Sequence, residues 1–325
     1  MSTNLVANVK WPIISRWKRL VLKYACDGKP TFVYGSNDDR QFDSFARDGA
    51  VLWIVSSHRD YPPTLVAQLK NIERIDESRE STIPPGLLSD LKPLGHGKMY
   101  RFKVRGAQGS RFYGHNDATP VLNELALLGK DGKIVKEAEE KWSPQKHGKV
   151  LQRPHRVDHA SPLKTFADKF QRQTVFISWK HCDVKGRKHE NLRKRNYVKE
   201  FARELNKNEV AVWLDEFALP NYRPKTADDN LMELLLRQGL KQSRVVIAVA
   251  SDQYGCRSLD STKNWTKREW QSKFRRNRVA LFTNDAQLAN HDCGGGSRSV
   301  NLDSASLHLS GKPLDAASLF LDWFK

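Results

Sequence analysis

The sequence predicts an α/β protein in which a parallel sheet occupies the C-terminal half and a smaller α+β or mostly β domain precedes it. Short apolar runs separated by segments of helical spacing carry the prediction. Strands that alternate with helices form parallel sheets covered by helices. The three clearest runs are Thr174–Trp179, Val210–Asp215 and Arg244–Ser251.

The segments between these runs have the apolar spacing of amphipathic helices. Residues 197–205 place Tyr197, Val198 and Phe201 on one stripe, and residues 231–238 repeat the pattern. A fourth strand is expected at Arg278–Phe282 and a terminal helix at Asp315–Phe324. Residues 174–325 therefore form one expected domain.

Residues 1–128 form the other expected domain, a candidate sensor or ligand-binding unit. Helical spacing predicts a helix over Ile13–Ala25, and Asp117 or Thr119 is expected to cap a second helix over Pro120–Leu128. Thr64–Asn71 is expected to pair antiparallel with Val51–Ser56. The remaining predicted strands are Thr31–Tyr34 and Met99–Val104.

Residues 129–173 are interpreted as a linker between the two domains. Lys130–Lys141 is highly charged, and Ser143–Pro162 contains three prolines and three histidines. Such composition is typical of connecting segments rather than of packed elements.

Composition limits the class of protein. The net charge of +18 is spread over both halves of the chain and is not concentrated in a basic tail. It favours polyanions or phosphorylated small molecules as partners. No apolar run reaches the length of a membrane span, which predicts no membrane partner. Cys26, Cys182, Cys256 and Cys293 lie far apart in the sequence, which indicates neither a disulfide framework nor a metal site and favours the cytoplasm.

Five segments in the C-terminal half occur in the order found in one known family. They are Thr174–Trp179, Val212–Asp215, Glu216–Thr226, Ser243–Ser251 and Trp265–Glu269. With these segments, residues 174–325 resemble a TIR (Toll/interleukin-1 receptor) domain. In order, they match the first strand, the second strand with its terminal Asp, the BB loop, the third strand and the W-x-x-x-E motif of that family. The resemblance implies a flavodoxin-like fold with a parallel sheet.

The chain departs from the common family pattern at three places. Trp179 stands where the family usually has Tyr. The insertion Cys182–Arg195 is long and very basic, and we interpret it as an extended loop. Leu219 is followed by Pro220, whereas family members more often have Gly there.

The resemblance implies cleavage of NAD+ between nicotinamide and ribose, with NAD+ as substrate and no cofactor. Glu269 matches the catalytic glutamate of the family. The reaction develops positive charge on the ribose, which one well-placed carboxylate stabilises. Trp265 lies one helical turn from Glu269 and would form an apolar wall beside it. The alternative is that Glu269 only forms a surface ion pair with Lys273.

Other residues are expected to bind the substrate or a second copy of the chain. The end of the first strand is expected to meet the pyrophosphate or the adenylate ribose. Exposed apolar residues of the BB loop are expected to contact a neighbouring TIR domain. The substrate-binding candidates are Ser178, Trp179, Lys180, His181, Asp215, Ser251 and Trp265, and the loop candidates are Phe217, Leu219 and Tyr222.

The first domain resembles PUA-like or EVE-type small barrels over Gly49–Ile72. Arg101, Lys103 and Arg105 alternate with Phe102 and Val104. Basic residues interleaved with aromatic ones are typical of a nucleic-acid or nucleotide surface, and a solvated strand face is the alternative. The same expected surface includes Arg111, Phe112, Tyr113 and His115, which follow closely in the sequence.

The expected function is that of an NAD+ nucleosidase, with or without cyclisation of ADP-ribose, that acts as an anti-phage or stress immune effector. The resemblance implies activation by homo-oligomerisation through TIR contacts, with a nucleotide or nucleic-acid trigger at the first domain. Two alternatives remain open. One is a non-enzymatic TIR adaptor that docks to other TIR domains, and the other is a nucleic-acid-binding protein on a TIR-like scaffold.

Overall fold

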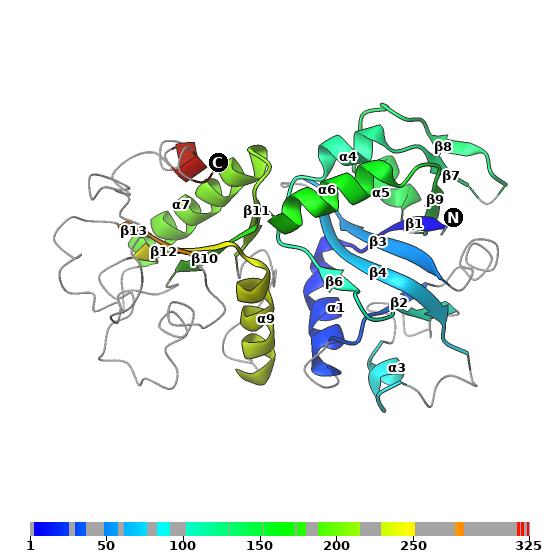
Figure 1. The fold of residues 1–325 in the computed structure, drawn as a ribbon, viewed down its shortest axis with the longest axis horizontal. Coiled ribbons are helices and arrows are strands. Elements are labelled where there is room, and N and C mark those ends of the chain that lie inside the picture. The colour runs from blue at the N-terminus through cyan, green and yellow to red at the C-terminus, as the bar shows by residue number, and fades with distance from the viewer. Residues whose placement is uncertain are drawn as a thin grey trace. The chain divides into compact units, whose positions relative to one another are not determined.

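The protein is mixed α/β and divides into two compact units (Figure 1). The first comprises Met1–Lys169 and Asp215–Leu235, and the second comprises Phe170–Leu214 and Leu236–Lys325. The computed structural model describes residues 3–25, 30–36, 49–57, 62–76, 83–91, 102–129, 131–151, 153–172, 174–179, 188–214, 229–250, 277–282, 317, 318, 320, 321 and 324. Over these residues, no helix has the length and apolar character needed to span a membrane.

A nine-stranded mixed sheet forms the first unit, with the order β2-β5-β4-β3-β1-β9-β7-β8 and β6 attached to β4. Strands β1 and β3 run parallel, and their neighbours pair antiparallel. The antiparallel pairing of β3 with β4 confirms the predicted hairpin. The strands are β1 (Asn4–Asn8), β2 (Val33–Ser36), β3 (Ala50–Ser56), β4 (Thr64–Arg74), β5 (Phe102–Arg105), β6 (Arg111–Phe112), β7 (Leu127–Leu128), β8 (Ile134–Lys136) and β9 (His155–Val157).

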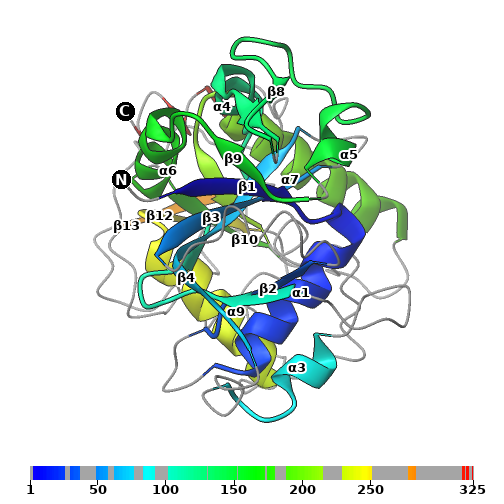
Figure 2. The same cartoon turned by 90° about the vertical axis from the view of Figure 1, so that its right-hand side faces the viewer.

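Helices cover both faces of this sheet (Figure 2). Helix α1 (Trp11–Lys23) packs on one face, where Trp17 meets the ring of Phe112 edge-on at 5.5 Å between centroids. On the other face, Trp53 of β3 belongs to a core with α4 (Thr119–Glu124) and α6 (Ser161–Arg172). Two shorter helices are α3 (Leu87–Asp90) and α5 (His147–Val150).

The interpretation of residues 129–173 as a linker is wrong. This segment forms β8, α5, β9 and α6, and β9 extends the sheet by pairing with β1. Several of its apolar residues are buried, with Val157 at 4% exposed and Leu163 at 0%. They form a core face that is hard to recognise in the sequence because charged residues lie between them. The first unit therefore continues well beyond residue 128, and its sheet is the larger of the two.

The helix predicted over Pro120–Leu128 is shorter than expected, because α4 ends at Glu124 and Leu127–Leu128 forms β7. A buried lysine holds the segment that follows α4. The Lys136 ammonium donates to the carbonyl oxygens of Asn123, Leu125 and Glu137 at 3.0, 2.9 and 2.8 Å. All three of its donors are used, and a cation suits the C-terminus of a helix.

A four-stranded parallel sheet forms the second unit, with the order β11-β10-β12-β13. It confirms the four strands predicted from the apolar runs. These are β10 (Thr174–Trp179), β11 (Ala211–Trp213), β12 (Val245–Ala250) and β13 (Asn277–Phe282).

Helices α7 (Lys188–Lys207) and α9 (Asp229–Gln242) follow β10 and β11 along the chain, as the spacing predicted. One expectation was wrong: the basic insertion is not an extended loop throughout, because α7 begins at Lys188. A long run of Lys and Arg is compatible with a helix, since both residues have high helix propensity.

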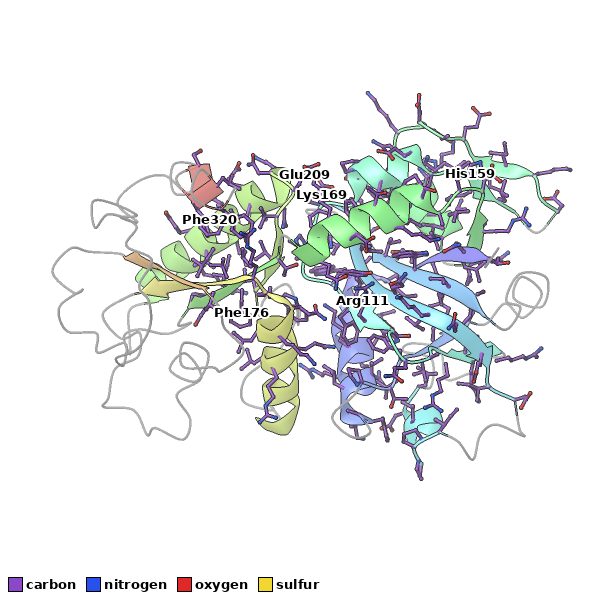
Figure 3. All side chains as sticks on the ribbon, viewed as in Figure 1. Arg111, His159, Lys169, Phe176, Glu209 and Phe320 are labelled. Atoms are coloured by element: carbon purple, nitrogen blue, oxygen red, sulfur yellow. The ribbon has the colours of Figure 1, made fainter. Side chains whose placement is uncertain are left out.

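Tight contacts fix the helices of the second unit. Phe201 of α7 packs edge-on against Phe320, at 6.5 Å between ring centroids. Figure 3 labels Phe320 and Phe176 in this unit. A Cβ atom added at Gly239 of α9 would lie 2.9 Å from the Trp213 ring and 3.1 Å from the Phe176 ring. Glycine therefore lets α9 approach the sheet closely.

We expect Lys136→Met to lower the free energy of unfolding by about 2 kcal/mol, because it leaves buried carbonyl groups without a donor. Chemical denaturation monitored by circular dichroism measures this change. The matched control is Lys164→Met on the exposed surface of α6. Equal stability of the two variants would contradict the role assigned to Lys136.

We expect Gly239→Ala to destabilise the second unit by about 1 to 3 kcal/mol through overpacking against Trp213, although alanine favours helices. Lys241→Ala, at an exposed position of the same helix, is the control. A Gly239→Ala protein more stable than wild type would show that the contact can relax.

Candidate functional site

The order of the parallel strands defines the candidate site. Numbered along the chain, the strands lie in the order second, first, third, fourth, so β10 has β11 on one side and β12 on the other. The connections that leave β10 and β11 therefore run in opposite directions. Open sheets of this kind bind ligands outside the carboxyl ends of the strands where the direction reverses, here those of β10 and β12.

The register brings the ends of these two strands to nearly the same level. Ser178 pairs with Ala248, and Trp179 pairs with Val249. Strand β11 ends lower, because its last residue, Trp213, pairs with Phe176. The last residue of β10, Trp179, and the last residue of β12, Ala250, therefore lie near each other at one edge of the sheet, although they are far apart in the sequence.

Two of the predicted site residues lie within the described part of the chain. Ser178 is 1% exposed and Trp179 is 5% exposed, so both side chains are buried at the end of β10. The expected stacking of a base on Trp179 stays a prediction. Lys180, His181, Asp215, Ser251, Trp265 and Glu269 lie outside the described residues, as do Phe217, Leu219 and Tyr222.

The expected aromatic surface of the first unit is wrong. Phe112, Tyr113 and His115 are at most 5% exposed. Phe112 lies in the core beside Phe32, at 4.7 Å between ring centroids. The alternation on β5 holds for the residues described, because Val104 is buried and Lys103 and Arg105 are partly exposed.

Arg111 has a packing role that the sequence did not reveal. Its Nε donates to Oε1 of Gln68 at 3.4 Å, and its guanidinium lies 5.7 Å from the Tyr113 ring centroid. Tyr113 donates to the same Gln68 oxygen at 3.3 Å. Burial raises the pKa of Tyr113 to about 12, so the phenol stays a neutral donor.

Lys18 is a second buried cation that sequence reasoning missed. It is 5% exposed, and its Nζ lies 5.8 Å from the Phe112 ring centroid. Burial lowers its pKa to about 8. The available signal was its position in the helical stripe of Ile14, Trp17 and Val21, where a lysine must face the core.

Glu140 forms hydrogen bonds with a lysine and a histidine at the start of α5. Its Oε1 accepts hydrogen bonds from Lys146 Nζ at 2.5 Å and from His147 Nε2 at 3.0 Å. The backbone N–H of Ser143 donates to Nδ1 of His147 at 2.9 Å. Nδ1 is therefore an acceptor, which places the proton of a neutral imidazole on Nε2.

A cavity of about 40 Å³ in the first unit is lined by Trp17, Leu20 and Tyr34, among others, and a space of this size holds only water-sized groups. The described residues also contain no group of three or more His, Cys, Asp or Glu placed to hold a metal ion.

Comparisons with protein-family models, with curated proteins and with solved structures find no match to this chain. Its function must therefore be inferred from the sheet and from the sequence motifs.

We expect Glu140 to stabilise the fold only above acidic pH. The hydrogen bond from Lys146, and secondarily that from His147, lowers the pKa of Glu140 from 4.5 to about 2. A carboxyl group with a lowered folded-state pKa stabilises the protein above its unfolded pKa and loses this effect as the pH falls through the folded value. The stability difference between wild type and Glu140→Gln should therefore shrink between about pH 4.5 and pH 2, as measured by denaturation across that range. A difference that does not change with pH would contradict the ion pair.

Proposed function

We propose that this chain is a cytoplasmic NAD+ nucleosidase whose C-terminal unit is a flavodoxin-like TIR domain. It hydrolyses the bond between nicotinamide and ribose, with or without cyclisation of the ADP-ribose. The protein acts as an immune effector against phage or stress, and its activity requires homo-oligomerisation. The first unit is a sensor domain.

The observation that carries this proposal is the strand order β11-β10-β12-β13 with all strands parallel. It matches the first four positions of the flavodoxin-like order, 2-1-3-4-5. The segments that resemble the TIR family supply the strands in this order, which supports assigning the motif residues to one domain. Without this order the motifs would be separate short similarities.

The register supports a dinucleotide site at the ends of β10 and β12. Lys180 and His181 continue the chain from β10, and Ser251 continues it from β12. Backbone N–H groups at such strand ends bind phosphate oxygens. The basic residues after β10 would attract a pyrophosphate.

Glu269 is the proposed catalytic residue, and it lies in the connection between β12 and β13. As the bond to nicotinamide breaks, positive charge spreads over the ribose. A carboxylate beside the ribose stabilises this charge and holds the ribose hydroxyls. Nicotinamide leaves as a neutral base, so the step needs no strong general acid.

We expect Glu269→Gln to lower the rate of nicotinamide release from NAD+ by at least about a hundredfold, because the amide removes the charge that stabilises the transition state. The assay follows nicotinamide by chromatography at high protein concentration, where oligomers form. Glu200→Gln on the exposed surface of α7 is the matched control and should retain wild-type activity.

The outcomes separate the proposed enzyme from its alternatives. Full activity of Glu269→Gln would remove this residue from the mechanism. Intact NAD+ with wild-type protein, together with saturable binding to another TIR domain, would favour the adaptor. Binding to DNA or RNA that weakens steeply with salt, again without loss of NAD+, would favour a nucleic-acid-binding protein.

A further inference from the structure

Three buried polar atoms of the first unit have no hydrogen-bond partner among the residues that the structure describes. They are Oδ1 of Asn8, Oγ of Ser57 and Nε1 of Trp142. Asn8 and Trp142 are each only 9% exposed. Buried polar atoms are nearly always hydrogen-bonded, so these three indicate that a further group binds beside them.

The three side chains lie at one end of the sheet and on one of its faces. Asn8 is the last residue of β1 and pairs with Val55 of the parallel strand β3. Side chains alternate between the two faces of a strand, so Asn8 shares a face with Val6, and Ser57 follows Val55 on the same face. Val6, Val55 and Trp142 belong to one core. The carboxyl ends of β1 and β3 therefore place polar side chains at the end of that core.

Helix α5 borders all three side chains. Nδ2 of Asn8 donates to the carbonyl oxygen of Gly148 at 3.3 Å, and the Trp142 ring lies 5.3 Å from the His147 ring between centroids. Gly148 is buried. Apart from its own helix and chain neighbours, a Cβ atom added there would have only Ser57 Oγ within 4 Å, at 3.9 Å. Buried space therefore remains beside this glycine, next to the unpartnered atoms.

The hydrogen-bonding capacity of these atoms selects the chemistry of the ligand. The indole Nε1 of Trp142 only donates, so a ligand must present an acceptor to it. Nδ2 of Asn8 is already used, which leaves Oδ1 as an acceptor that needs a donor. A carboxylate or phosphate offers no donor, and an ammonium group offers no acceptor. A primary carboxamide offers both from one carbon atom, and the Ser57 hydroxyl can bond with either of them.

We propose that the first unit binds a small molecule through a primary carboxamide, which lies beside Gly148 between α5 and the carboxyl ends of β1 and β3. Nicotinamide carries this group, and the proposed reaction releases nicotinamide, so the choice of this molecule rests on the proposed function. The first unit then senses the product that the second unit forms.

Isothermal titration calorimetry of the full chain with nicotinamide, in the absence of NAD+, tests the chemistry of the site. Nicotinamide and benzamide should both bind, whereas nicotinate, which has a carboxylate in place of the carboxamide, should not. Nicotinate that binds as tightly as nicotinamide would overturn the proposal. Absence of nicotinamide binding would also overturn it, and a buried water would then be the partner of these atoms.

Two neighbouring serines provide matched variants. Ser57→Ala removes a hydroxyl without a partner among the described residues, so it should leave the Tm unchanged and raise the nicotinamide Kd by roughly tenfold. The Ser56 hydroxyl donates to the carbonyl oxygen of Val9 at 2.7 Å. Ser56→Ala should therefore lower the Tm by about 2 to 4 °C and leave the Kd unchanged. Equal Kd values for the two variants would overturn the proposal.

Two tryptophans of the same core give a second pair. Nε1 of Trp53 donates to Oδ1 of Asn4 at 3.1 Å, whereas Nε1 of Trp142 has no partner among the described residues. Trp142→Phe should weaken nicotinamide binding, and Trp53→Phe should not. Nicotinamide bound only at the ends of β10 and β12 would be unaffected by Trp142→Phe or by Ser57→Ala. That result would overturn this inference and leave the proposed enzyme intact.

Discussion

The second unit depends on the parallel pairing of β10 with β12. These strands are separated in the chain by α7, β11 and α9, yet their register is continuous from Val175–Val245 to Trp179–Val249. Parallel strands bring their carboxyl ends to one edge of the sheet. This pairing makes Trp179 and Val249 neighbours at that edge. The close approach of α9 at Gly239 keeps a helix against the same sheet.

In the first unit, helices cover both faces of the sheet, and buried polar side chains form hydrogen bonds with backbone groups. Asn116 is 0% exposed, and its side chain accepts from the N–H of Leu65 and donates to the carbonyl oxygen of Leu65. Lys136 does the same for three carbonyl groups. Buried polar groups of this kind are tolerated because they are hydrogen-bonded.

The sequence predicted those elements whose apolar pattern is strong. The four strands of the second unit are uninterrupted apolar runs, and α1 has a regular stripe, so local patterning was sufficient. It failed where few apolar residues sit among charges. Strand β9 is only His155–Val157 and is stabilised by pairing with β1, which is distant in the chain.

At β6, the alternation of basic and aromatic residues led to a wrong prediction for a related reason. It predicted an exposed surface at Arg111 and Phe112, but Phe112 points to the core and Arg111 packs on Tyr113. Whether one face of a strand is exposed to solvent depends on the helices that cover it, and these helices come from elsewhere in the chain. Of the candidate site, Ser178 and Trp179 were placed correctly at the end of a strand, whereas the catalytic role of Glu269 stays a prediction.

Hydrogen–deuterium exchange of Glu269→Gln with and without NAD+ tests most directly where the nucleotide binds. A nucleotide bound at the ends of β10 and β12 should slow exchange in the peptides that follow Trp179 and Ala250 and leave exchange in the nine-stranded sheet unchanged. Protection confined to the nine-stranded sheet, or no protection at saturating NAD+, would contradict a nucleotide site at the ends of β10 and β12.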